Sequence, residues 1–291
     1  MVKKVLIVND IPGAGKVAGN INIPILAAAY VETAILPTLL LSTQTGGDYH
    51  NIVVRHMDDA FAQILSHWQI NQINFDGYLT GYFAKPKQIE DFYSYYKKEK
   101  QNHADIKLIM DPIMGDGGDF YDGFNHTILD AFSKLIPYVD IIMPNLTEAS
   151  LLSGYPYKPH FKNEDYYHMA QTIRQKGVNT VILTGVLKDN KIGFYLLNAD
   201  YPQGKYILHT MYKPEMFGTG DIVVSLLTAL YVHGYPIVNS LEWIGHFIEK
   251  VFELTFSLRR DRKWGLYYEP LLYQINQFME EIIYDKKQSN I

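Results

Sequence analysis

The stretch FGTGDIVVSLLTALYVH, residues 217–233, carries the strongest prediction of fold and chemistry in this chain of 291 residues. Its Gly-Thr-Gly-Asp turn leads directly into an apolar run that is typical of a buried helix. The first N–H groups of a helix have no intrahelical partner and lie at the positive end of its dipole. Gly218 and Gly220 carry no side chain, so an anion can approach these N–H groups closely. We therefore predict an anion-binding helix N-terminus.

Asp221 places a carboxylate at the mouth of this predicted anion site. Backbone N–H groups for a developing negative charge and a base for an attacking hydroxyl together suit phosphoryl transfer. An ordinary helix start, with glycine in the loop and an acid in the first turn, explains the same residues. Short glycine motifs are common by chance, so this segment alone leaves both interpretations open.

The composition narrows the class of protein. The chain is 47% hydrophobic and 20% charged, which is typical of a globular protein with a sizeable core. Lys and Arg number 26 against 31 Asp and Glu, so the net charge of −5 gives no electrostatic basis for binding nucleic acid or an anionic membrane. The absence of Cys excludes disulfides, thiolate metal sites and thiol nucleophiles. The N-terminus does not resemble a signal peptide, and no apolar run reaches the roughly 18 residues of a membrane span, so we expect a cytoplasmic protein.

Short apolar runs alternate with helical patterns along most of the chain. The expected strands cover residues 5–8, 75–79, 106–110, 139–143 and 180–183, and each ends at a polar or Gly/Pro turn. The expected helices cover residues 18–30, 57–68, 87–100, 124–135 and 165–176. This alternation predicts parallel βαβ units around a buried sheet.

The pattern changes after residue 190. Alternating residues predict antiparallel edge strands at 192–197 and 206–212, followed by long helices at 221–232 and 238–258. An amphipathic stretch at 269–284 suits either packing on the body of the protein or a contact in a dimer. No linker, repeat or low-complexity segment is visible, so we expect residues 1–291 to form one domain.

Polar residues follow each of the five expected parallel strands. In open α/β sheets, ligands bind beyond the carboxyl ends of the strands. Singly, these residues have structural explanations: Asp111 before Pro112 suits a turn, and Asn145 with Glu148 suits a helix-capping pair. Together they favour a ligand site. The segments are Asn9-Asp10, Thr80-Gly81-Tyr82, Asp111 to Asp116, Asn145 to Glu148, and Thr184-Gly185.

Gly13-Ala14-Gly15-Lys16 is not a Walker A loop, although it resembles the end of one. Asp10 stands where that motif needs its first glycine, and Val17 stands where a hydroxyl must hold magnesium. No Gly-x-Gly-x-x-Gly follows the first strand either, so a dinucleotide fold of the usual kind is unsupported.

Taken in order, the motifs resemble the pyridoxal kinases of the ribokinase superfamily. They are Gly218-Thr219-Gly220-Asp221, Asp111 to Asp116, Pro144-Asn145-Leu146-Thr147-Glu148, Thr80-Gly81-Tyr82 and the segment Leu41 to Gly46. The resemblance runs from about residue 4 to 258. It implies a ribokinase-like, three-layer α/β/α fold with a mostly parallel central sheet and antiparallel edge strands.

The resemblance also implies a reaction: ATP-dependent phosphorylation of the 5′-hydroxymethyl group of pyridoxal, pyridoxamine or pyridoxine. Asp221 would be the general base, and the N–H groups of Gly218, Thr219 and Gly220 would form the anion hole. Such kinases use Mg²⁺, commonly a monovalent cation such as K⁺, and form homodimers.

The remaining implied roles divide the site in two. The substrate pocket would be lined by Asp10, Val17, Thr45 and Tyr82. ATP would contact Asp116, Asn145, Glu148, Thr184 and Gly185, and Mg²⁺ would be held, mostly through water, by Asp111, Asp116, Asn145 and Glu148.

Departures from the family pattern leave alternatives open. Asp10 stands where serine is common, and a carboxylate there could favour a protonated ring nitrogen or an amine, so the order of vitamers is open. Phe217 replaces a cysteine that in some relatives traps the aldehyde, which excludes that chemistry. Residues 10–15 also resemble the hydroxymethylpyrimidine kinases of thiamin synthesis, the first alternative. A non-catalytic nucleotide- or pyridoxal-phosphate-binding protein is the second, and the intact Asp221 argues against it.

Overall fold

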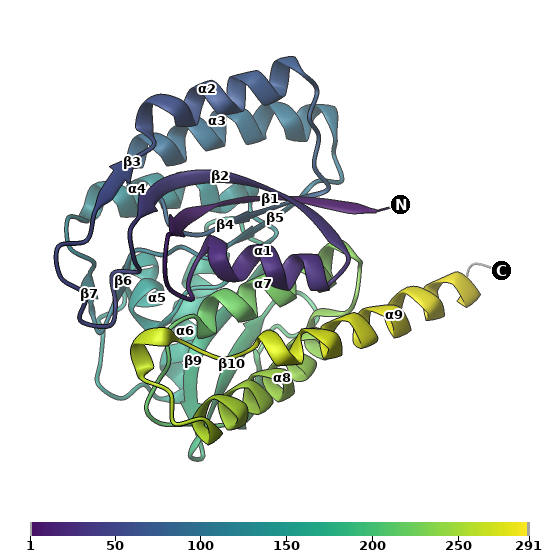
Figure 1. The fold of residues 1–291 in the computed structure, drawn as a ribbon. Helices are drawn as coiled ribbons and strands as arrows, with labels where there is room; N and C mark the ends of the chain where they lie inside the picture. Colours follow the sequence, from purple (N-terminus) through teal and green to yellow (C-terminus); the bar gives the residue numbers. More distant parts are fainter. Residues whose placement is uncertain (1, 290–291) are drawn as a thin grey trace.

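The computed structural model describes residues 2–289 and is built around one large twisted sheet (Figure 1). Its strand order is β11-β10-β9-β8-β5-β4-β1-β2-β3. The strands are β1 (Lys3–Pro12), β2 (Val31–Leu41), β3 (Val54–His56), β4 (Gly77–Thr80), β5 (Lys107–Met110), β8 (Ile141–Ile142), β9 (Thr180–Lys188), β10 (Lys191–Leu197) and β11 (Lys205–Thr210). A separate hairpin pairs β6 (Gly115–Asp116) with β7 (Asp119–Phe120).

Helices cover both faces of the sheet. They are α1 (Gly19–Ala28), α2 (Asp58–Ile70), α3 (Pro86–Asn102), α4 (His126–Leu135), α5 (Leu146–Ser153), α6 (Asn163–Arg174), α7 (Thr219–Val232), α8 (Ile237–Ser257) and α9 (Leu272–Ser289). Short 3₁₀ turns lie at Ile136–Tyr138, Arg262–Trp264 and Glu269–Leu271.

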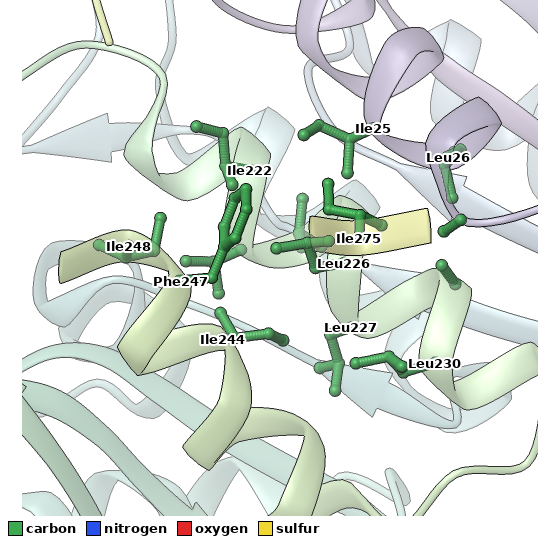
Figure 2. Close-up of a cluster of buried hydrophobic side chains, with 14 of the residues drawn as sticks. Ile25, Leu26, Ile222, Leu226, Leu227, Leu230, Ile244, Phe247, Ile248 and Ile275 are labelled. Atoms are coloured by element: carbon green, nitrogen blue, oxygen red, sulfur yellow. The ribbon is translucent and has the colours of Figure 1, made fainter. Parts of the chain in front are cut away.

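Alternating residues of the strands pack into two separate hydrophobic cores, one on each face of the sheet. In β1, Val5 and Ile7 pack with α1, α7, α8 and α9, whereas Leu6 and Val8 pack with the core on the side of α2 to α6. This is the alternation expected of a strand that is buried on both faces. Figure 2 shows the first core, in which α7 contributes side chains such as Leu226 and Leu230 between α1 and α8. The predicted three-layer α/β/α arrangement is confirmed.

The sheet is parallel in its centre and antiparallel at its edges, as predicted. The strands β2, β1, β4, β5, β8 and β9 pair in parallel. At one edge β10 and β11 run antiparallel, and at the other edge β3 runs antiparallel to β2. The carboxyl ends of the six parallel strands therefore meet along one edge of the sheet, where the polar segments begin.

The pattern analysis missed one long strand, β2. Residues 31–41 contain Pro37 and end in three consecutive Leu, and their polar and apolar residues do not alternate cleanly, so neither a strand nor a helix pattern emerges. Parallel pairing with β1 along almost its whole length makes this segment a strand.

The C-terminal stretch that sequence left undecided packs on the body of the protein. Ile275, Met279 and Ile282 of α9 are buried in the core with α1 and α8, and the Asn276 side chain donates to the carbonyl of Ala28 at 2.5 Å. Within residues 2–289, no helix combines the length and the hydrophobicity that crossing a bilayer requires.

Candidate active site

A cavity of about 730 Å³ lies at the carboxyl edge of the parallel strands. It brings together residues that are far apart in sequence: Asp10, Val17, Thr45, Tyr82, Asp111, Asp116, Asn145, Glu148, Thr184, Gly220 and Asp221 line one wall or another. Every predicted substrate residue and every predicted metal ligand is among them. The separate polar segments therefore do form one site.

The N-terminus of α7 opens into this cavity. Gly218 is the N-cap residue and adopts a left-handed conformation with φ of 88°. An added Cβ at Gly218 would lie 2.3 Å from the carbonyl oxygen of Lys16, so glycine is required both by the turn and by the close approach of two backbones. The first N–H groups of α7 are left free of helical partners, with Gly220 at the cavity wall.

Asp221 lies in the first turn of α7 and faces the cavity. Burial raises the pKa of its carboxyl from 3.8 to about 6, and a hydrogen bond from the backbone N–H of Ala18 partly opposes the shift. Ala18 has φ of 52° and ψ of −134°, a conformation that side-chain-bearing residues rarely adopt. Asp221 is thus a carboxylate with a raised proton affinity that is still ionised at neutral pH, as a general base requires.

Asp111 and Glu148 form the acidic floor of the cavity. Burial, followed by the charge of Asp221, raises the pKa of Asp111 well above its ordinary value. Burial, followed by the charge of Asp111, does the same for Glu148. None of the residues that line the cavity is Lys or Arg. A cation supplied with the ligand would offset this concentration of negative charge.

The capping interpretation of Asn145 and Glu148 is also correct. The Asn145 side chain accepts from the N–H of Glu148 at 2.9 Å, and the Glu148 carboxylate accepts from the N–H of Asn145 at 2.8 Å and of Met114 at 3.2 Å. The Asn145 amide also donates to the carbonyl of Gly115 at 2.9 Å. These side chains are therefore fixed in place, with few lone pairs left for direct coordination.

The donor set suits a hydrated magnesium ion rather than a closed cage. Among residues 2–289, no group of three or more His, Cys, Asp or Glu side chains is arranged to hold a metal ion by itself. Mg²⁺ characteristically keeps several waters and binds through one or two carboxylates together with substrate phosphates. Asp111 and the more exposed Asp116 offer such carboxylates at the cavity.

Asp10 and Tyr82 also line the cavity. Asp10 is only 8% exposed, and a hydrogen bond from its own backbone N–H lowers the pKa of its carboxylate. Burial, followed by the charge of Asp221, raises its pKa to about 7. The Tyr82 ring stacks on Phe124 with centroids 5.3 Å apart. A buried carboxylate beside a fixed aromatic ring is suited to a flat ligand with a basic or N–H-bearing group.

Some predicted residues lie beside the cavity rather than in its wall. Gly218 and Thr219 form the turn behind Gly220, and the Thr219 hydroxyl donates to the carbonyl of Met216 at 3.0 Å. Gly185 is exposed in an irregular step of the β9–β10 pairing with φ of 70°, while its neighbour Thr184 lines the cavity.

The structure adds wall residues to which the sequence analysis gave no individual role. Chief among them are Ala18, Gln44, Phe120, Tyr121 and Asp122. Phe120 ends strand β7, and Tyr121 and Asp122 follow the β6–β7 hairpin, whose two-residue strands give no periodic signal. Ala18 carries no functional group, and only its backbone conformation reveals its role.

This geometry, a carboxylate at a glycine-rich helix N-terminus in an oxygen-lined cavity, is the kind that a small-molecule kinase on a doubly covered α/β sheet would use. The phosphomethylpyrimidine kinase family profile matches residues 33–263, and the chain belongs to this family. The architecture is ribokinase-like, and the chain is similar to pyridoxal kinases over most of its length.

Named relatives support this assignment. The pyridoxal kinase of Dictyostelium discoideum is 24% identical over 228 residues, which cover 71% of this chain and 72% of that protein. The crystal structure of the Lactobacillus plantarum pyridoxal kinase superimposes with a TM-score of 0.89 at 26% identity, over 97% of this chain and 99% of that one. A Bacteroides thetaiotaomicron protein, provisionally assigned as a phosphomethylpyrimidine kinase, was crystallised with pyridoxal. Its structure superimposes with a TM-score of 0.86 at 28% identity, over 95% of this chain and 96% of that one.

Proposed function

We propose that the protein transfers the γ-phosphoryl group of ATP to the 5′-hydroxymethyl group of a B6 vitamer. One observation carries the proposal: Asp221 lies at the N-terminus of α7 in the same cavity as the Asp10–Tyr82 wall and the acidic floor. An acceptor alcohol held on that wall meets a base, and a phosphoryl group above the helix N-terminus meets unpaired N–H groups.

The reaction then follows from the positions of these groups. The Asp221 carboxylate takes the proton of the acceptor hydroxyl while the hydroxyl oxygen bonds to the γ-phosphorus of ATP. The bond between the γ-phosphorus and the bridging oxygen breaks, and ADP leaves with its electrons. The N–H groups of Gly218, Thr219 and Gly220 bind the transferring oxygens. Mg²⁺ supplies charge neutralisation for the phosphates when it is bound, and Asp111, Asp116, Asn145 and Glu148 would hold it largely through water.

The relatives support a B6 vitamer over the alternatives. The named relatives described above are pyridoxal kinases, and the Bacteroides protein, provisionally assigned to the pyrimidine kinases, was crystallised with pyridoxal. The family description therefore does not separate the two substrates. Hydroxymethylpyrimidine stays the second candidate because its amino group could bond to the Asp10 carboxylate and because, like the vitamers, it carries a hydroxymethyl group as acceptor.

The test is ATP consumption in the presence of Mg²⁺ and K⁺, run in parallel with pyridoxal, pyridoxamine, pyridoxine and hydroxymethylpyrimidine. Turnover confined to the vitamers supports the proposal. Turnover with the pyrimidine alone moves the protein to thiamin synthesis and keeps the chemistry of Asp221. ATP binding without turnover of any acceptor contradicts the kinase proposal and favours a binding protein.

The role of Asp221 has its own test. Asp221→Ala should fold and bind ATP but lose turnover by about 10²- to 10⁴-fold, the usual contribution of a general base. Glu215→Gln, an exposed acid six residues earlier, is the control and should keep full activity. Near-normal turnover in Asp221→Ala would refute the assignment. The homodimer and K⁺ activation stay predictions of the family resemblance, and the cytoplasmic location stays a prediction from the sequence pattern.

A further inference from the structure

A chain of buried polar side chains runs from the wall of the cavity to the first turn of α7. The Asn9 amide donates to Asn22 Oδ1 at 2.9 Å, and the Asn22 amide donates to Ser225 Oγ at 2.9 Å. Ser225 Oγ in turn donates to the backbone carbonyl of Asp221 at 2.6 Å. The three side chains come from β1, α1 and α7 and are at most 2% exposed.

At its other end, this series of hydrogen bonds contacts the part of the cavity wall formed by Asp10 and Tyr82. Asn9 Oδ1 accepts from the backbone N–H of Asp10 at 3.0 Å and of Tyr82 at 2.9 Å. The β1–β2 register shifts between Asn9 and Ile11, and the Asn9 side chain supplies an acceptor for the Asp10 N–H at that irregularity. Such breaks in a ladder often re-aim a side chain beside an active site.

Packing fixes the Asn9 amide as firmly as its hydrogen bonds do. A methyl group added to Gly81 would lie 2.7 Å from Asn9 Nδ2 and 2.8 Å from Oδ1, so only glycine leaves room for the amide. Buried amides must keep their partners, because an unsatisfied polar group in a low-dielectric interior is costly. This series of hydrogen-bonded side chains therefore fixes how β1, α1 and α7 are arranged at the site.

We propose that Asn9, Asn22 and Ser225 are positioning residues that hold the general base in register with the wall that binds the acceptor. The inference rests on the proposed function, in which Asp221 acts on an alcohol held beside Asp10 and Tyr82. A misplacement of about 1 Å between reacting groups can cost up to 10²-fold in rate. A chain that spans both groups through the interior controls that distance.

The variant Ser225→Ala removes the hydroxyl through which the series of hydrogen bonds reaches α7. It has a matched control on the same helix. Thr228 is also fully buried, and its hydroxyl donates to the carbonyl of Val224 at 2.7 Å, one turn further on and outside the chain. Thr228→Val removes that bond at nearly constant volume. The loss of a hydroxyl bond to the carbonyl four residues earlier would affect both variants alike, whereas only Ser225→Ala also removes the acceptor of the Asn22 amide.

Two readouts separate positioning from stability. With the acceptor that the wild-type enzyme turns over, Ser225→Ala should lower kcat by about 10-fold or more while KM for ATP changes less than about twofold, and Thr228→Val should keep kcat. By amide hydrogen exchange, Ser225→Ala should speed exchange of the Tyr82 N–H on a different element, and Thr228→Val should not. Equal kcat values in the two variants, or an unchanged Tyr82 rate in Ser225→Ala, overturns the proposal.

A second variant keeps the proposal testable if Ser225→Ala does not fold. Gly81→Ala forces a methyl group against the Asn9 amide without removing any polar group and should reproduce the loss of kcat. In a double-mutant cycle, Asn22→Ala and Ser225→Ala should be strongly non-additive in kcat, since each breaks the same chain, whereas Asn22→Ala and Thr228→Val should add. Additivity of the first pair contradicts the inference.

The exchange measurement also separates this inference from the proposed function. If no vitamer or pyrimidine is turned over, the kinase proposal fails, but the Tyr82 exchange rate still reports whether the chain links α7 to the cavity wall. If turnover is present and the exchange rate is unaffected, the positioning inference fails alone.

Discussion

Asp10→Asn should stabilise the ligand-free protein, and the gain should grow with pH. The Asp10 carboxyl is 8% exposed, and burial together with the charge of Asp221 raises its pKa from 3.8 to about 7. Folding therefore disfavours the ionised form of the carboxyl, because burial removes its contact with water. Asparagine has nearly the same shape and no charge to bury.

The magnitude follows from proton linkage. Below pH 3.8 the carboxyl is protonated in both states and the mutation removes no charge. Between pH 3.8 and 7 the unfolded chain ionises first, so the free energy of unfolding falls by about 1.4 kcal/mol per pH unit. Above pH 7 the loss is complete, at about 4 kcal/mol, and at pH 5 it is about 1.6 kcal/mol. Asp10→Asn should recover these amounts.

The assay is thermal and urea unfolding of both proteins at pH 5 and pH 8 without ligands. An unfolding entropy of about 2 cal/mol/K per residue converts the gains into roughly 3 °C at pH 5 and 7 °C at pH 8. Asp130→Asn, an exposed acid on α4, is the control and should show little change between the two pH values. A gain that is the same at both pH values, or a loss at pH 8, would refute the reasoning.

Three further predictions address the site. The kcat/KM for the acceptor should fall about tenfold per pH unit below pH 6, because the pKa of Asp221 is about 6 and only its ionised form accepts a proton; a profile that is flat from pH 5 to 8 would contradict this. Gly218→Ala should cost more stability than the roughly 1 to 2 kcal/mol of left-handed strain alone, because its Cβ meets the Lys16 carbonyl; Gly154→Ala, with φ of 70° and open space around its Cβ, is the control in urea unfolding. Removing Mg²⁺ with a chelator should abolish turnover, and Asp116→Asn should raise the Mg²⁺ concentration for half-maximal rate; turnover unchanged in both cases would exclude the assigned metal role.

The location of the cavity and most of its polar lining were predictable from short segments. A glycine turn before an apolar helix predicts free N–H groups, and polar residues after buried strands predict a site at the carboxyl edge of the sheet. Both inferences need only local sequence, because helix termini and strand ends are local features. The capping pair of Asn145 and Glu148 shows that a structural role and a place in the cavity coexist in the same residues.

Other features depended on partners distant in sequence. The strand β2 has a weak pattern of its own and becomes a strand by pairing with β1. The hairpin of β6 and β7, which leads Tyr121 to the cavity, is too short for any periodic signal. Such segments take their conformation from tertiary contacts, which outweigh weak local preferences.

By itself, the sequence determined the class of fold and the glycine-rich turn before α7, because these follow from local periodicity and turn chemistry, and it predicts Asp221 as the base. Only the tertiary structure decided the strand order, the raised proton affinity of Asp10 and the chain from Asn9 to Ser225. Asn22 and Ser225 are 203 positions apart in sequence, yet their side chains share a hydrogen bond. Burial and long-range contacts arise only when the layers pack together, so no local pattern encodes them.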